Sequence, residues 1–206
     1  MERHVNIHLK AYLELISLFY LRQSGFREHH SCQTALIKSI DDWLSTINEN
    51  KIAGSLFLDF SKALDLVNHS LLIHKLKLYN IDTLWFSSYL NKRFQQTHYV
   101  DAVSDKQEGI SGVPQGSVIG SILFLIYIND IPLSLTSTCA DIFADDTTVG
   151  TSSHSIDTLV ETLTTDLQNV LSWCNSNNRH QMFPKLNLCI SHLDTNSRFL
   201  QIVIMI

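Results

Sequence analysis

A short apolar segment that ends in a carboxylate is the feature that most restricts how this chain can fold. Residues 54–58 read Gly-Ser-Leu-Phe-Leu and are followed directly by Asp59. The length and the unbroken apolar character of this run are typical of a central strand of a sheet. A carboxylate at the end of a buried strand is unfavourable unless it is paired, hydrogen-bonded or bound to a metal ion. Asp59 is therefore a candidate functional residue.

A second acidic feature lies far along the chain. Asp145 and Asp146 are adjacent and lie between two β-prone segments, residues 141–144 and 147–149, which predicts a hairpin with two carboxylates at its tip. Their mutual repulsion would be relieved by a divalent cation. If folding brought them to Asp59, three carboxylates would suit two Mg²⁺ ions and an in-line displacement at phosphorus. The alternative is ordinary turn chemistry, since Asp is favoured in turns.

The rest of the pattern predicts helices around these strands. One helix has an apolar stripe that we expect to be buried, formed by Leu36, Ile40, Trp43, Leu44 and Ile47. The order of elements predicts an α+β fold in which helices cover one face of a sheet. The predicted helices cover residues 5–21, 33–48, 62–79 with Ser61 as N-cap, 83–92, 117–130 and 156–175, and two further strands cover 94–101 and 106–111.

Composition excludes several classes of protein. Hydrophobic residues make up 45% and charged residues 17%, which excludes a disordered chain. The net charge is −5, whereas a protein that holds nucleic acid by itself usually has a basic face. Either the chain does not bind nucleic acid, or its basic parts lie elsewhere in a longer protein. The four cysteines form no CxxC pair and indicate free thiols in a reducing compartment. No apolar run reaches the length of a membrane span.

Three segments resemble the catalytic motifs of reverse transcriptases from non-LTR retrotransposons of the LINE or jockey-like type. Residues 56–69, which contain Asp59, resemble the first motif, residues 112–120 the second, and residues 143–147, which contain Asp145 and Asp146, the third. Segments around residues 23–36, 85–95 and 173–185 resemble further motifs of the same family, in the same order. The resemblance covers roughly residues 1–190.

The resemblance implies a right-hand polymerase fold that comprises partial fingers and a palm, without a thumb. It places a reverse transcriptase domain at residues 1–190, with the fingers at about 1–50 and the palm at about 51–190. Residues 191–206 depart from the family and form a divergent tail with an apolar, β-prone end. A basic fingers motif, a thumb and an endonuclease region are expected in a longer polyprotein, and their absence here would explain the acidic net charge.

The activity implied by the resemblance is RNA-directed DNA synthesis, in which a primer 3′-hydroxyl attacks the α-phosphate of a dNTP. Asp59, Asp145 and Asp146 would be the catalytic residues and would bind Mg²⁺, with Mn²⁺ as an alternative cation. The implied partners are an RNA template, a DNA primer and dNTP, and no membrane. The family acts in both cytoplasm and nucleus, and the sequence does not decide between them.

Further site residues follow from the same motifs. The implied nucleotide-binding residues are Phe60, through its backbone, Leu64, Gln115, Gly116 and Lys185, and the implied template or primer contacts are Arg27 and Pro114. Each has a plainer alternative: Gln115 as a turn residue, and Lys185 and Arg27 as solvated surface cations. The family usually has an aromatic residue at the position of Leu64, which excludes a ribose 2′-hydroxyl. Leucine there predicts weaker selection for deoxynucleotides.

The sequence leaves two alternatives to an active polymerase open. In the first, the chain is a catalytically inactive retroelement remnant that keeps the fold or acts as a module that binds nucleic acid or protein. In the second, the chain does not fold stably, because its apolar tail and exposed surfaces drive aggregation.

Overall fold

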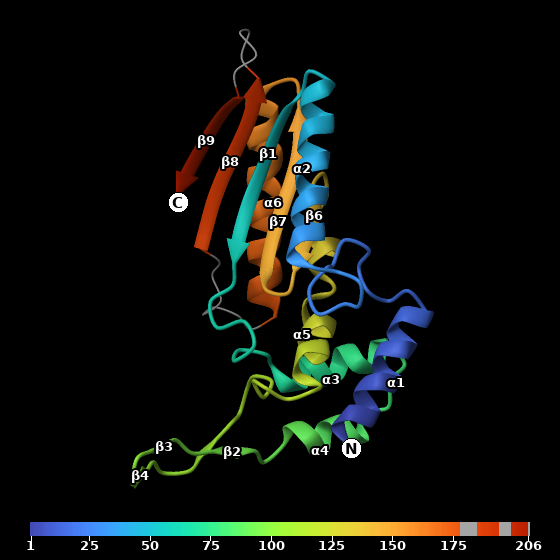
Figure 1. Cartoon of the computed structure of the whole chain (residues 1–206), viewed down its shortest axis with the longest axis vertical. Coiled ribbons are helices and arrows are strands. Elements are labelled where there is room, and N and C mark those ends of the chain that lie inside the picture. Colours follow the sequence, from blue (N-terminus) through green and yellow to red (C-terminus); the bar gives the residue numbers. More distant parts are fainter. Residues whose placement is uncertain (178–184, 194–198, 206) are drawn as a thin grey trace. The chain divides into compact units, whose positions relative to one another are not determined.

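The computed structural model describes residues 1–177, 185–193 and 199–205 (Figure 1). The chain divides into two compact units. The helical unit comprises residues 1–18 and 62–127, and the sheet unit comprises residues 19–61 and 128–206. Each unit is therefore built from two separate stretches of sequence. The predicted boundary between fingers and palm near residue 50 remains a prediction.

The sheet unit contains a five-stranded antiparallel sheet in the order β6-β7-β1-β8-β9. The predicted central strand and the predicted hairpin are both confirmed, and the apolar end of the chain adds the edge strand β9. A 3₁₀ turn, η1, precedes β6. The bounds are β1 Ile52–Asp59, η1 Ile131–Ser134, β6 Cys139–Phe143, β7 Asp146–Ser153, β8 Lys185–Leu193 and β9 Phe199–Met205.

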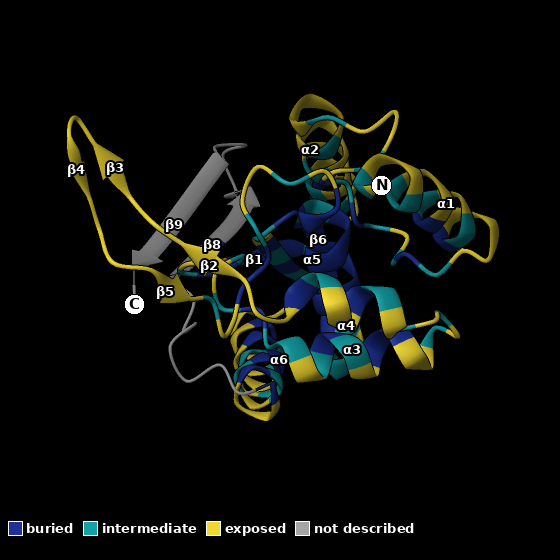
Figure 2. Ribbon diagram, turned by 90° about the horizontal axis from the view of Figure 1, so that it is seen from below, coloured by how far each residue is buried: buried dark blue, intermediate teal, exposed yellow. Residues whose placement is uncertain are grey.

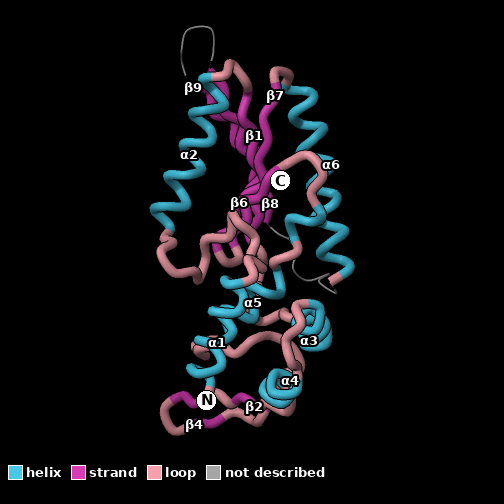
Figure 3. The backbone as a smooth tube through the Cα atoms, turned by 90° about the vertical axis from the view of Figure 1, so that its right-hand side faces the viewer, coloured by secondary structure: helices cyan, strands magenta, loops and turns pink. Residues whose placement is uncertain are grey.

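Two helices cover opposite faces of this sheet (Figure 3). Helix α2, Cys32–Asn48, contacts β1 and β6, and helix α6, Ile156–Ser176, contacts β7 and β1. The prediction of a sheet covered on one face was therefore wrong. The reason lies in β1, whose residues are small or apolar on both faces. A Cβ at Gly54 would lie 2.5 Å from Leu159 Cδ2, so glycine allows α6 to approach the strand backbone closely.

The predicted apolar stripe of α2 is mostly exposed. Ile47 is buried and Trp43 contacts Phe57 edge-to-face, but Leu36 and Leu44 are 58% and 51% exposed. The described residues supply one layer, the sheet, on one side of α2, so the outer part of the stripe has no described element to pack against.

Helix α6 follows its prediction more closely and adds one unexpected residue. Leu159, Leu163, Val170 and Cys174 are buried at helical spacing along one face. Asp166 is fully buried on the same face. A carboxylate in that position needs several hydrogen-bond donors.

The donors to Asp166 come from the loop before β6. Oδ1 accepts from the backbone N–H of Thr136 at 2.9 Å and from its hydroxyl at 2.7 Å. Oδ2 accepts from the backbone N–H of Ser137 at 3.0 Å and of Thr138 at 2.9 Å. Asn169 adds a side-chain donor at 3.0 Å. Burial alone would raise the pKa of Asp166, but these hydrogen bonds outweigh it and hold the pKa far below its usual range.

The helical unit contains four helices and two short ribbons. Helix α5 is apolar all round and buried, while the ribbons are exposed (Figure 2). No helix among the described residues is long and apolar enough to cross a membrane. The bounds are α1 Glu2–Leu15, α3 His69–Leu78, α4 Leu84–Leu90 and α5 Gly120–Ile128, with ribbons of β2 Phe94–Gln95 against β5 Gln107–Glu108 and β3 His98–Tyr99 against β4 Ala102–Val103.

Two predicted helices have different bounds in this unit. Helix α1 ends at Leu15 rather than near residue 21, because Ser17 adopts a φ of 51° and the N–H of Leu18 bonds back to Leu13 O at 2.9 Å. The predicted helix over 62–79 starts only at His69, capped by the Asn68 side chain.

The first part of that predicted helix has other backbone partners. The carbonyls of Leu64 and Val67 accept from the N–H groups of Val113 and Gly112, both at 2.8 Å. Residues 62–68 therefore pair with a distant loop and cannot form helical hydrogen bonds throughout.

We predict that Asp166→Asn lowers the free energy of unfolding by about 2–4 kcal/mol. The asparagine amide would turn an NH₂ group toward backbone N–H donors and leave them unsatisfied. Chemical denaturation measures the loss. Glu161→Gln, on an exposed position of the same helix, is the matched control and is expected to change stability by less than about 0.5 kcal/mol. Equal stability of the two variants would contradict the assigned role.

The same carboxylate predicts a pH dependence of stability. The folded pKa of Asp166 is lowered, so its contribution is present above the unfolded value of about 3.9 and is lost as the pH falls below it. The stability difference between the wild-type chain and Asp166→Asn should therefore be constant near neutral pH and shrink in acid. Denaturation series at several pH values test this, and a difference that grows in acid would refute it.

Candidate active site

Three carboxylates meet at one end of the sheet. In the register of β1 and β7, Asp59 is opposite Asp146, and Asp145 lies in the two-residue loop between β6 and β7. The structure thus brings together the three acids that the sequence pattern singled out. We call Asp59, Asp145 and Asp146 the acidic cluster. Asp59 and Asp146 are exposed and Asp145 is half-buried.

The hairpin loop has a special backbone. Its first residue, Ala144, has a φ of 56°, and Phe143 pairs with Asp146 across the loop. A positive φ at this position is typical of the tight turns that match the twist of antiparallel strands. A residue with a Cβ adopts it only when its surroundings hold it there.

The charges of the acidic cluster repel one another. Partial desolvation raises the pKa of Asp146, and the negative charges of Asp145 and Asp59 raise it further. Within residues 1–177, no hydrogen bond reaches these three carboxylates. In the described part of the chain, no group of three or more His, Cys, Asp or Glu side chains is placed so that it could hold a metal ion.

The segment before α2 supports the hairpin loop. Gln23 is buried, and its Oε1 accepts from the backbone N–H of Gly25 at 2.7 Å and of Ala144 at 3.3 Å. The backbone of this segment also bonds to both sides of Ile142, with Ser24 N–H donating at 2.8 Å. The segment therefore lies beside β6 as a short parallel partner.

Gly25 allows this close approach. A Cβ there would lie 2.1 Å from the nitrogen of Ala144, so any larger residue would collide with the hairpin backbone. The supporting roles of Gln23 and Gly25 were missed at the sequence level. The sequence feature that could have indicated these roles is the motif around residues 23–36, which contains Gln23 and Gly25 as well as Arg27.

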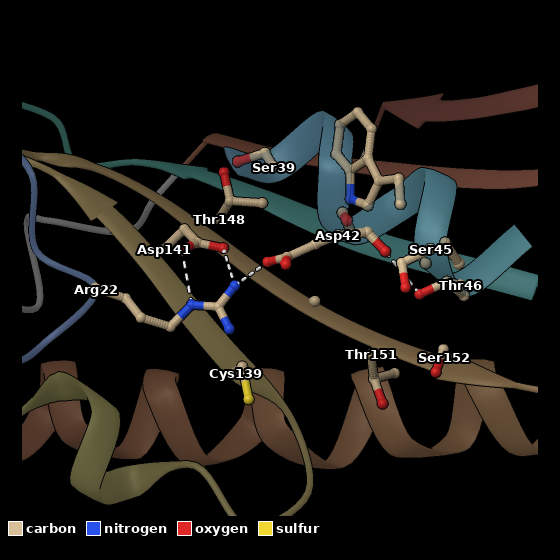
Figure 4. A pocket seen from close by; sticks show the side chains of 15 residues that line it. Arg22, Ser39, Asp42, Ser45, Thr46, Cys139, Asp141, Thr148, Thr151 and Ser152 are labelled. Atoms are coloured by element: carbon tan, nitrogen blue, oxygen red, sulfur yellow. Dashed lines mark hydrogen bonds and ion pairs between the residues drawn. The ribbon is translucent and has the colours of Figure 1, made fainter. Parts of the chain in front are cut away.

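Ion pairs hold α2, the preceding segment and β6 together (Figure 4). The Arg22 guanidinium donates to Asp141 at 2.8 and 3.0 Å and also pairs with Asp42, and Lys38 donates to Asp141 at 3.0 Å. The hydrogen bond to Asp141 raises the pKa of Arg22. Burial opposes ionisation of Asp141, but its bonds to Arg22 and Lys38 prevail and lower its pKa.

Two cavities adjoin these ion pairs. The groove in Figure 4 has a volume of about 260 Å³, and the acidic cluster does not line it. A second cavity of about 310 Å³ is lined by Asp146, Phe143 and the first turns of α2, including Lys38. Of the two, only the second reaches a member of the acidic cluster, Asp146.

Three other predicted residues belong to the sheet unit. The Arg27 guanidinium lies 5.4 Å from the centre of the Phe19 ring and donates to the carbonyl of Gln23 at 3.3 Å. The Phe60 side chain is buried, so only its backbone is available to a ligand. Lys185 is opposite Asp59 in the register of β1 and β8, and its side chain lies outside what the structure describes.

The remaining predicted residues belong to the helical unit. Gly116 has a φ of 79°, a conformation that favours glycine, and Pro114 and Leu64 are half-buried. The Gln115 side chain is exposed, and its Nε2 donates to Asp65 Oδ1 at 2.8 Å. Gln115 lines a cavity of about 740 Å³ within this unit.

Comparison with known proteins decides the family. Residues 1–199 match the family described as "Reverse transcriptase (RNA-dependent DNA polymerase)". The chain belongs to the reverse transcriptase family. Two similar relatives come from Drosophila melanogaster. The probable RNA-directed DNA polymerase from transposon X-element is 31% identical over 64% of this chain, and the RNA-directed DNA polymerase from mobile element jockey is 32% identical over 65%.

The chain spans about one-sixth of the length of these relatives, 15% and 16% respectively.

Solved structures agree on the fold. A telomerase from Candida tropicalis, truncated from its C-terminal domain, matches 98% of this reverse transcriptase chain and 40% of its own, with a TM-score of 0.51 at 9% identity. A telomerase from Candida albicans, in complex with a fragment of telomeric RNA, matches 98% and 34%, with a TM-score of 0.53 at 14% identity. The α+β polymerase fold, with a palm and part of the fingers, is thereby confirmed.

We predict that Gly25→Ala destabilises the hairpin loop, because the added methyl group meets the backbone of Ala144. The expected loss in the free energy of unfolding is about 2 kcal/mol or more, as for other overpacked sites. Thermal or chemical denaturation measures it. Gly109→Ala is the matched control, since its added Cβ would have only one neighbour, at 3.8 Å. If both variants were equally stable, Gly25 would not support the loop.

Proposed function

We propose that this reverse transcriptase chain catalyses RNA-directed DNA synthesis, with the acidic cluster as its catalytic centre. The observation that carries the proposal is the meeting of Asp59, Asp145 and Asp146 at one end of the sheet, in a chain whose family is defined by this activity. The relatives named as RNA-directed DNA polymerases support the reaction, and the telomerase solved with telomeric RNA supports an RNA partner.

The acidic cluster fits divalent cations by its chemistry. Hard cations such as Mg²⁺ and Mn²⁺ bind carboxylate oxygens, and the cluster supplies three carboxylates to which no described group donates a hydrogen bond. Their mutual repulsion favours a positive charge beside them. Bound cations would activate the primer hydroxyl and stabilise charge on the transferred phosphate. The protein contributes by holding its acids at a fixed end of the sheet.

The other predicted residues keep the roles implied by their motifs. In the sheet unit, the backbone at Phe60 and the side chain of Lys185 would contact the nucleotide, and Arg27 would contact template or primer. In the helical unit, Leu64, Gln115 and Gly116 would contact the nucleotide, and Pro114 would contact template or primer. The reaction then depends mainly on positioning and on charge stabilisation.

We predict that Asp145→Asn reduces Mg²⁺-dependent primer extension on an RNA template by at least about a hundredfold, through loss of electrostatic stabilisation at the transferred phosphate. The assay contains purified chain, an RNA template annealed to a labelled DNA primer, Mg²⁺ and the four dNTPs. Asp157→Asn, an exposed position on α6, is the control and should retain activity. Failure of a cooperatively folding wild-type chain to extend primer would overturn the proposal and favour an inactive remnant.

A second prediction concerns Leu64. Leu64→Phe should increase the preference for dNTP over rNTP about tenfold, because a larger ring restricts space beside the sugar. Single-nucleotide incorporation of each nucleotide measures the ratio of kcat/KM values. Equal discrimination by the two proteins would show that Leu64 does not contact the sugar.

A further inference from the structure

Residues 64–67 and residues 111–113 of the helical unit are in close backbone contact around Asp65. The Ser111 hydroxyl donates to the carbonyl of Asp65 at 3.1 Å, beside the backbone bonds that join Leu64 and Val67 to the same loop. A Cβ on Gly112, whose φ is 85°, would lie within 3.0 Å of three backbone atoms of Asp65. The position of Asp65 relative to the loop is therefore set by the backbone and not by its side chain.

The Asp65 side chain has one described partner, and it is Gln115. Oδ1 of Asp65 accepts from Nε2 of Gln115 at 2.8 Å. An ionised carboxylate only accepts hydrogen bonds, so the NH₂ side of the amide must face it. The amide oxygen of Gln115 then remains available as an acceptor for another group. An asparagine or serine in place of Asp65 would not impose this orientation.

We propose that Asp65 is a positioning residue, which orients the Gln115 amide so that its oxygen is presented to a hydrogen-bond donor of the incoming nucleotide. This inference rests on the proposed function, because it assigns the recognised ligand to the polymerase reaction. It adds a residue to which neither the motifs nor the relatives assign a role here. Asp65 acts through Gln115 and does not touch the reacting atoms.

The cavity beside this pair suits a nucleotide. Its volume of about 740 Å³ lies within the range of small-molecule sites. Three side chains that carry or can carry positive charge line it: Lys62, His69 and Arg93. Such side chains favour phosphate. Two acids, Asp65 and Glu108, also line this cavity, and the Asp65 carboxylate keeps its charge when it accepts from the neutral Gln115 amide.

A spectroscopic measurement tests the orientation without any need for activity. In a ¹⁵N-labelled chain, the side-chain NH₂ signals of Gln115 are identified by their loss in Gln115→Glu. We expect Asp65→Asn and Asp65→Ala to shift these signals. Asp101→Asn, an exposed acid of the same unit, is the control and should leave them in place. Unchanged signals in both Asp65 variants would overturn the proposal.

Kinetics test the consequence for the nucleotide. Asp65→Asn should raise KM for dNTP about fivefold and leave kcat within about twofold, because the lost interaction is made before the chemical step. In a double-mutant cycle, Asp65→Asn should add nothing to Gln115→Ala. Additive effects, or a fall in kcat at constant KM, would show that Asp65 acts by another route. Cooperative thermal unfolding of each variant excludes a folding defect.

The two proposals fail in different ways. Primer extension by the wild-type chain, with shifted Gln115 signals but an unchanged KM in Asp65→Asn, would leave the polymerase function intact and overturn the role of Asp65. A wild-type chain that neither extends primer nor binds dNTP would overturn the proposed function, and with it nucleotide recognition through Gln115. Shifted signals together with a raised KM support both.

Discussion

The register of β1 against its two neighbours is the constraint on which the candidate active site depends. β1 pairs with β7 and β8 along most of its length, and this pairing sets Asp59 opposite Asp146 on one side and Lys185 on the other. A slip of one residue would turn every side chain of β1 to the other face of the sheet. Because α2 and α6 cover the two faces with different side chains, such a slip is unfavourable, and burial of β1 fixes where the acids lie.

The hairpin loop carries Asp145 and leads directly into Asp146 at the start of β7, and it needs support of its own. Ala144 adopts a positive φ, and the surrounding groups that hold it there are the Gln23 side chain and the backbone at Gly25. Both come from the segment that leads into α2. The ion pairs of Arg22 with Asp141 and Asp42 join the same segment to β6 and to α2. The loop is therefore held in place by packing and hydrogen bonds from outside the hairpin.

Sequence patterns predicted the elements that depend on local periodicity. The strand ending at Asp59, the hairpin at Asp145 and the long helix α6 follow from apolar spacing and turn residues, and the structure agrees. The patterns gave wrong predictions where contacts with residues far along the chain determine the local structure or its burial. Residues 62–68 looked helical, but they pair with residues 111–113. The stripe on α2 looked buried, but the described residues cover only one side of that helix. Gln23 and Asp166 gave no sign of burial, because most of their partners are loop N–H groups that leave no trace in the sequence.

Five acids of the sheet unit fall into two groups by their hydrogen-bond donors. Asp166 receives five donors and Asp141 is paired with Arg22 and Lys38, so both are stabilised as anions by the protein itself. The acidic cluster receives no donor within residues 1–177, and the pKa of Asp146 is raised rather than lowered. Folding thus stabilises Asp166 and Asp141 as anions through donors of the protein, whereas the three acids at the end of the sheet receive no such donor from residues 1–177. Their oxygens accept no hydrogen bond from residues 1–177, and hard cations bind carboxylate oxygens, which supports the proposed cation-binding role.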